Sequence, residues 1–109
     1  MGTLAERICA AQGAIGELEE AIHRIVGDVT LCVEFIFYFK DDNSLEFAFR
    51  WAPSPEDKIS PEQGKAILEL GFSKFTVKWP NYTDQEGYWN EDKTECICGD
   101  RNPIKGDYN

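Results

Sequence analysis

Histidine is almost absent from this chain, and so are the motifs on which many enzymes depend. One histidine, His23, occurs among 109 residues, and it falls within a predicted helix, away from any G-x-S-x-G nucleophile turn. No glycine-rich loop followed by Lys and Ser or Thr is present to bind phosphate. The paired carboxylates are adjacent in the sequence, which is typical of an acidic surface and does not indicate an acid–base catalytic pair. The sequence therefore predicts a protein that is not an enzyme and that has no catalytic residue, cofactor or metal site.

A long apolar run and a basic leader are also missing. No apolar run approaches the ~18 residues of a membrane span, and the segment 1–6 has no basic region before an apolar core. These absences predict a cytoplasmic protein with no membrane partner. At 109 residues the chain is expected to form one α+β domain over residues 1–98, followed by a loose tail over residues 99–109, which contains Pro103 and Gly106.

Basic residues are outnumbered by acidic ones. The chain has 11 Lys and Arg against 20 Asp and Glu, which gives a formal net charge of −9. Because nucleic-acid binding depends on Lys and Arg that neutralise phosphate, this balance argues against a direct nucleic-acid partner. It favours a basic protein partner, since complementary charges steer association. Composition leaves open the alternative that the acidity serves only solubility.

Cysteine is too sparse for a disulfide framework. The four cysteines are Cys9, Cys32, Cys96 and Cys98. Their positions in a predicted helix, a predicted strand and a late segment favour buried thiols. Cys96-Ile97-Cys98 places two sulfurs on one face of a strand, but a metal needs two further soft or imidazole ligands. A labile thiol pair is the alternative to a purely structural role.

A helix is predicted from Leu4 to Val26. Thr3 and Glu6 have the spacing of a capping box at its start. Its apolar residues step by four and three along one seam: Leu4, Ile8, Ala11, Ile15, Leu18, Ile22 and Ile25. The seam favours packing on the protein's own sheet, with a helix-mediated homodimer as the alternative. Gly13 and Gly16 disfavour a helix, so we expect a close approach or a bend there.

A β-hairpin with one aromatic face is predicted between Leu31 and Trp51. Apolar and polar residues alternate along both strands. The register that keeps the aromatic residues together pairs these residues: Phe39 with Phe47, Phe37 with Phe49, and Phe35 with Trp51. It leaves Asp42-Asn43-Ser44 as the loop. The opposite face then carries a mixture of charged and apolar side chains, with Ile36 opposite Arg50.

The second half of the chain predicts one helix and two strands. Ser60 caps a short helix that begins at Pro61, with Gln63 completing a second capping box. Strands are expected from Phe75 to Trp79 and from Thr94 to Cys98, separated by a polar loop. The predicted class is α+β: an antiparallel sheet of about four strands, with both helices packed on one face in the order α-β-β-α-β-β.

Three short segments of this half resemble a bacterial family. They are Ile59-Ser60-Pro61-Glu62-Gln63, Ile67-Leu68-Glu69-Leu70-Gly71-Phe72 and Pro80-Asn81-Tyr82. Together with the hairpin, over about residues 35–89, they resemble the small secretion-chaperone-like proteins of the TY-chaperone-like group. The resemblance implies an α-β-β(-β)-α-β-β plan, frequent homodimers and a non-enzymatic role in holding a partner polypeptide. The chain departs from that pattern by lacking a clear strand over residues 51–60 and a final helix, so no family binding residue carries over.

Two functional hypotheses follow from the sequence. The first is a chaperone-like or adaptor module that binds an extended protein segment. The alternative is a small acidic inhibitor, such as a toxin-immunity or phage anti-defence protein, that blocks the basic nucleic-acid groove of an enzyme. Residues predicted to bind the partner lie on the mixed hairpin face and in the Glu86–Glu95 loop: Ile36, Tyr38, Arg50, Glu86, Tyr88, Trp89, Glu91 and Asp92.

Overall fold

The computed structural model describes residues 3–10, 13–27, 31–42, 44–54 and 57–104. Within them the chain forms three helices and one antiparallel sheet of five strands, in the order β2-β1-β3-β4-β5. The elements are α1 (Leu4–Cys9), α2 (Ile15–Val26), β1 (Leu31–Tyr38), β2 (Glu46–Ser54), α3 (Pro61–Leu68), β3 (Lys74–Lys78), β4 (Gln85–Trp89) and β5 (Cys96–Cys98). The predicted α+β class is confirmed, with five strands instead of about four.

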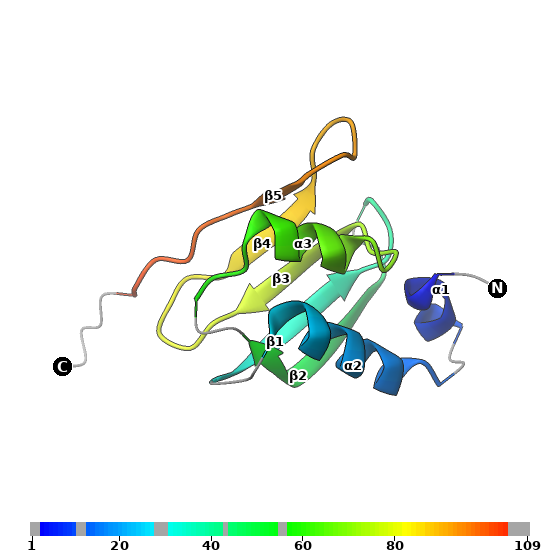
Figure 1. The fold of residues 1–109 in the computed structure, drawn as a ribbon, viewed down its shortest axis with the longest axis horizontal. Helices are drawn as coiled ribbons and strands as arrows, with labels where there is room; N and C mark the ends of the chain where they lie inside the picture. The colour runs from blue at the N-terminus through cyan, green and yellow to red at the C-terminus, as the bar shows by residue number, and fades with distance from the viewer. Residues whose placement is uncertain (1–2, 11–12, 28–30, 43, 55–56, 105–109) are drawn as a thin grey trace.

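Helix α3 connects two strands that are not neighbours in the sheet. Strands β2 and β3 each pair antiparallel with β1, which lies between them, so β2 and β3 run in the same direction. A connection between parallel strands has to cross a face of the sheet, and a helix commonly makes that crossing. The crossover places α3 over β4 and β5, on the face that α2 also covers (Figure 1).

The predicted single N-terminal helix is wrong, because the structure has two helices there. Gly13 has a φ of 76°, in the left-handed region that a continuing helix does not use. The Arg7 guanidinium donates hydrogen bonds of 2.7 and 2.6 Å to the two carboxylate oxygens of Glu17, which joins α1 to α2 across the break. The predicted capping box of Thr3 and Glu6 is confirmed at the start of α1.

The hairpin of β1 and β2 has a different register from the predicted one. Phe37 faces Phe47, two positions away from its predicted partner. The cause is a longer turn over residues 40–44, closed by a 3.0 Å hydrogen bond from the amide of Phe39 to the carbonyl of Leu45. Over Phe35–Tyr38 the shift is even, so the predicted division into two faces is preserved there. Opposite Glu34, β2 has one extra residue, and this bulge shifts the register by one, so that Ala52 lies opposite Val33, contrary to the predicted faces.

The core lies between the sheet and the helices. Phe35 and Phe37 stack with 5.2 Å between ring centroids, and Phe72 tilts against Phe37 at 4.7 Å. Fully buried aliphatic side chains pack on these rings from the helix side and from the loop before α3: Leu18, Ile22, Ile59, Ile67 and Leu68. The predicted cap of α3, Ser60 with Gln63, is also confirmed. The helices thus cover the aromatic face of the sheet and leave the other face without a described helix.

Strand β4 lies where the sequence predicts a polar loop over residues 81–92. Its core-facing positions are Gln85 and Gly87, so the apolar alternation that marks a strand is absent. Gly87 lies directly opposite Phe75 in β3, and the Phe75 ring occupies the space that a side chain would take. The glycine is therefore required by the packing of its neighbour.

Replacing Gly87 by Ala is expected to lower the free energy of unfolding by about 2 kcal/mol. The added Cβ would overlap the ring of Phe75, which is fully buried and has to shift. Gly99→Ala is the matched control, because the nearest atom to its added Cβ is the carbonyl oxygen of Glu86 at 3.7 Å. Urea unfolding of both variants measures the difference, and equal losses would contradict this packing.

Gln85 joins the loop before α3 to the sheet through four hydrogen bonds. Its side chain is fully buried, and its oxygen accepts from the amide of Ile59 at 2.9 Å and from the indole of Trp79 at 3.2 Å. Its amide nitrogen donates to the carbonyl of Ile59 at 2.8 Å and to that of Gly99 at 3.0 Å. These bonds use both donors and both acceptor positions of the side chain. One residue thus positions the start of α3 and the segment after β5.

Residues 99–104 belong to the stretch that the sequence predicts as a loose tail, and they pack along the loop between β3 and β4. Backbone hydrogen bonds tie the two segments together. The guanidinium carbon of Arg101 lies 4.3 Å from the ring centroid of Trp79 and 4.2 Å from that of Tyr82. Such cation–π contacts anchor the segment on the body of the protein. Residues 105–109 lie outside the described part of the chain.

Candidate functional site

The face of the sheet opposite α2 and α3 is the candidate site, and we call it the open face. Alternate positions of the strands project to it and align across the sheet. Its described members are Glu34, Ile36, Tyr38, Glu46, Ala48, Lys74, Thr76, Lys78, Glu86, Tyr88 and Ile97. None of them belongs to the apolar core. The face is therefore a polar and aromatic surface built on a rigid sheet.

One row of side chains runs across four strands of the open face, from β1 to β5. Tyr38 pairs with Lys74, Lys74 with Tyr88, and Tyr88 with Ile97, so the four side chains are successive neighbours. The Lys74 Nζ lies 5.0 Å from the centroid of the Tyr38 ring and 3.6 Å from a carboxylate oxygen of Glu86. Tyr88 is 43% exposed and Ile97 is 44% exposed. The row thus presents an aromatic and an aliphatic side chain side by side to solvent.

The charged groups of the open face are arranged as cross-strand pairs. Glu34 lies opposite Lys78, and the Lys78 Nζ donates a 3.1 Å hydrogen bond to Asp84, the residue before β4. That hydrogen bond and the charge of Asp84 raise the pKa of the Lys78 ammonium, and Glu34 adds to the effect. Carboxylates on this side of the sheet outnumber the ammonium groups: Glu34, Glu46, Asp84 and Glu86 stand against Lys74 and Lys78. The described part of the face is net acidic.

The centre of the open face contains a buried hydroxyl group. Thr76 pairs with Ile36 on one side and Glu86 on the other, and only 4% of the residue is exposed. Its Oγ1 has no hydrogen-bond partner among the described atoms. A buried polar atom without a partner is costly, so a group that displaced the long side chains above it could gain a hydrogen bond there.

The structure brings together four of the residues predicted to bind a partner. Ile36, Tyr38, Glu86 and Tyr88 all lie on the open face, although they come from the hairpin and from the predicted loop. The predicted opposition of Ile36 and Arg50 is wrong, because Ala48 faces Ile36. The side chain of Arg50 lies outside the described part of the structure.

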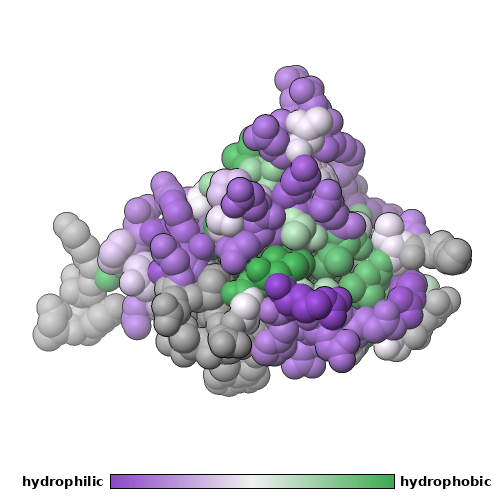
Figure 2. Space-filling view, in the orientation of Figure 1, coloured by the Kyte–Doolittle hydropathy of each residue, from purple (hydrophilic) through white to green (hydrophobic). Residues whose placement is uncertain are grey.

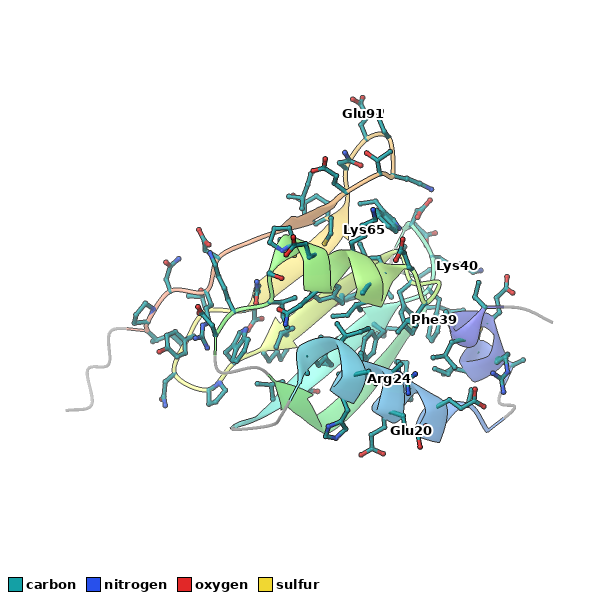
Figure 3. The ribbon with its side chains drawn as sticks, in the orientation of Figure 1. Glu20, Arg24, Phe39, Lys40, Lys65 and Glu91 are labelled. Carbon is teal, nitrogen blue, oxygen red and sulfur yellow. The ribbon has the colours of Figure 1, made fainter. Side chains whose placement is uncertain are left out.

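Three other predicted residues lie away from the open face. Trp89 is half-buried on the helix side, where it lines a pocket of about 250 Å³ together with Phe39 and Phe72. Glu91 and Asp92 are exposed in the turn between β4 and β5, and Figure 3 shows Glu91 projecting from its tip. The described members of the predicted binding set are therefore divided among three places: the open face, the helix-side pocket and the turn between β4 and β5.

Sequence analysis missed two members of the row, Lys74 and Ile97. Lys74 has no distinctive local pattern, and each of the two becomes part of the row only through the order of the strands. The signal that could have indicated Ile97 is the alternation of Cys96-Ile97-Cys98, because two thiols facing the core send the residue between them to the other side.

The helix side of the molecule carries apolar surface of its own. Figure 2 shows hydrophobic side chains exposed between α2 and α3 and toward α1. A second pocket there, of about 280 Å³, is lined by residues of α1 and of the β1–β2 turn, among them Phe39 and Leu45. Nothing in the described structure identifies what covers this surface.

Two cysteines lie together where α3 packs on β5. The Sγ atoms of Cys96 and Cys98 are 3.3 Å apart, and the Cys98 Sγ lies 3.5 Å from the carbonyl oxygen of Ser60. Cys9 is exposed, in contrast to the predicted burial of the thiols, and the side chain of Cys32 is not described. In the described ranges, no group of three or more His, Cys, Asp or Glu side chains is arranged to hold a metal ion.

Comparison of the chain with family models, with curated proteins and with solved structures gives no match. Among the helices that the structure describes, none is long and apolar enough to span a membrane. The site is therefore interpreted from its own residues.

Proposed function

We propose that this protein is a non-enzymatic binding module that docks a partner polypeptide on its open face. The observation that carries the proposal is the row of Tyr38, Lys74, Tyr88 and Ile97, which exposes large side chains on a sheet face with no described helix over it. Aromatic residues that are held rigidly beside charged groups are typical anchors of protein interfaces. The resemblance to the TY-chaperone-like group remains a prediction that points the same way.

The chemistry of the open face favours a basic partner segment that carries an apolar side chain. Tyr88 and Ile97 offer an apolar contact, the carboxylate of Glu86 lies beside Tyr88 on β4, and the carboxylate of Glu46 continues the row beyond Tyr38 on β2. Lysine or arginine in the partner would meet these carboxylates, and the net charge of −9 would steer the approach. The occupant to which we commit is therefore a polypeptide with an apolar anchor between basic residues.

The face is a better docking place than the sheet edges. Edge strand β5 has three residues, which is short for the pairing of an added strand. The other edge strand, β2, contains Pro53, which has no N–H to donate, and its hairpin is irregular at a bulge. Both edges thus have features that discourage strand addition.

A substitution of one exposed isoleucine tests the docking face. Ile97→Lys is expected to weaken binding about tenfold, because it removes the apolar contact and repels a basic segment. Tyr88→Lys is expected to weaken binding for the same reasons. Ile104→Lys is the matched control: Ile104 is 48% exposed, against 44% for Ile97, lies in the 99–104 segment outside the row, and receives the same change of charge. Short synthetic peptides with one Leu or Phe between Lys and Arg residues are the probes, measured by fluorescence anisotropy.

Three results would contradict this proposal. The first is equal binding by Ile97→Lys and Ile104→Lys, and the second is equal affinity for control peptides in which Glu replaces the basic residues. The third is a dimer that Ile97→Lys dissociates and Ile104→Lys does not, which would make a second copy of the chain the occupant. Sedimentation of each variant before titration detects that dimer.

The acidic inhibitor remains the alternative, because Glu91 and Asp92 stand at an exposed hairpin tip. It requires a Glu91→Lys/Asp92→Lys double variant to abolish binding while Tyr88→Lys has little effect. It also requires the association rate to fall steeply as salt rises. The cytoplasmic location stays a prediction under either function.

A further inference from the structure

Cys96 and Cys98 form a side-by-side thiol pair on the core face of β5. They occupy alternate positions of the strand, so both side chains point toward α3 while Ile97, between them, points to the open face. Their Sγ atoms are 3.3 Å apart. Cys96 is 5% exposed and Cys98 is half-buried, so a small reagent has access first to Cys98.

Helix α3 is shaped to receive both sulfurs. Gly64, in the middle of the helix, faces the pair, and an added Cβ there would lie 2.5 Å from the Cys96 Sγ and 2.6 Å from the Cys98 Sγ. A glycine in a helix interior lowers helix stability relative to alanine, so close packing is the gain that offsets it. The space beside α3 is thus taken by two thiols and not by an apolar side chain.

The surroundings of the pair distinguish the two thiols. The hydrogen bond between the sulfurs lowers the pKa of the Cys98 thiol, and the positive charge of Lys58 adds to this effect. The same hydrogen bond and burial raise the pKa of the Cys96 thiol. The carbonyl of Ser60 acts in the opposite direction, since it accepts a hydrogen bond from Cys98 only in the thiol form. The charge of Lys58 and the shared hydrogen bond make Cys98 the better nucleophile.

We propose that Cys96 and Cys98 are a redox-active dithiol that closes to an intramolecular disulfide by exchange with a small-molecule disulfide. The Cys98 thiolate attacks one sulfur of the reagent, R–S–S–R, and the first RS⁻ leaves with a proton from solvent. Cys96 then gives up its proton and attacks the Cys98 sulfur of the mixed disulfide, which releases the second RS⁻. The protein loses two hydrogen atoms and two electrons, and the reagent becomes two RSH.

Closure of this disulfide changes the open face through Ile97. Alternate Cα atoms of an extended strand are about 6.5 to 6.8 Å apart, at the upper end of the range for disulfide-linked residues. The bond therefore contracts β5 and disturbs its pairing with Gly87 and Trp89 of β4. Ile97 lies between the two cysteines and pairs with Tyr88, so a contraction of β5 shifts both residues on the open face. This coupling rests on the proposed function of the open face, whereas the disulfide itself does not.

The test uses the full chain with Cys9→Ser and Cys32→Ser, so that only the pair can react. After treatment with glutathione disulfide, mass spectrometry is expected to show the loss of two hydrogen atoms and of both alkylatable thiols. Reduced glutathione should restore them. In the same background, Cys96→Ser should keep a glutathione adduct on Cys98, and Cys98→Ser should react about tenfold more slowly. Circular dichroism checks that each variant is folded, with Ala replacing Ser where Ser unfolds the protein.

The outcomes separate the chemistry from its consequence. A lasting glutathione adduct on the parent pair, or no reaction at all, would overturn the dithiol. Equal rates in the two single variants would overturn the assignment of Cys98 as nucleophile. With the disulfide formed, the basic peptide probe should bind about tenfold more weakly, and the amide resonances of Tyr88 and Ile97 should shift. Unchanged affinity and resonances would overturn the coupling, whereas no peptide binding in either redox state would overturn the proposed function alone.

Discussion

Replacing Gln85 by Leu is expected to lower the free energy of unfolding by about 4 kcal/mol. Leucine has a similar volume, but it leaves without partners the buried amide and carbonyl of Ile59 and the indole N–H of Trp79. The carbonyl of Gly99 also loses its donor. Each buried group left unpaired costs about 1 to 3 kcal/mol, so the sum is large even with partial relaxation.

Gln85→Glu provides a matched control for the polar contacts. The variant keeps acceptor oxygens for Ile59 and Trp79 but loses the two N–H donors. At neutral pH it also places an ionised carboxylate in a buried site, which is costly. We expect its loss in urea unfolding to be smaller at low pH, where the carboxyl is protonated and donates one hydrogen bond. A Gln85→Leu variant as stable as the parent protein would show that these four bonds do not hold the loop before α3.

Phe37→Ala is expected to cost about 3 to 5 kcal/mol, and Tyr38→Ala about 1 kcal/mol. Phe37 is fully buried and contacts the rings of Phe35 and Phe72 at centroid distances of 5.2 and 4.7 Å, so its loss leaves a cavity. Tyr38 is the next residue and points to the open face beside Lys74, where water replaces the lost ring.

The comparison of these neighbours tests the division of the sheet into two faces. Urea unfolding at one pH and one salt concentration gives both values. Equal losses would mean that the two side chains are not on opposite faces. A peptide titration of the Tyr38→Ala variant adds a second measurement, since we expect that variant to stay folded and to bind the basic probe more weakly than the parent.

Local signals in the sequence predicted local structure well. The caps at Thr3 and Ser60 are confirmed because a capping box is determined by residues three positions apart. The aromatic face of the hairpin is confirmed for Phe35, Phe37 and Phe47, because alternation depends on the strand alone. The register is wrong because it depends on the length of the turn, and Asp42-Asn43-Ser44 fits either a short or a longer loop.

Other features depend on residues that are distant in sequence. Strand β4 has no apolar alternation by which the sequence could predict it. Its core-facing residues are Gln85, which binds the loop before α3, and Gly87, which makes room for the ring of Phe75. For a similar reason, the sequence predicted only some of the residues on the open face. Tyr38 and Tyr88 each belong to a strand with its own pattern, but Lys74 joins them only because β3 lies between β1 and β4.

The order of the strands also determines when the open face comes into existence. The sheet consists of two parts that are each continuous in sequence, the β1–β2 hairpin and the β3–β4–β5 meander, joined only by the ladder between β1 and β3. Each part can form from near neighbours, whereas the ladder pairs Ile36 with Thr76 and closes a long loop. We expect that junction to be the last and slowest step of folding. Since Tyr38 and Tyr88 come from different parts, a newly synthesised chain acquires its binding surface only at that step, and a partner cannot capture it half-folded.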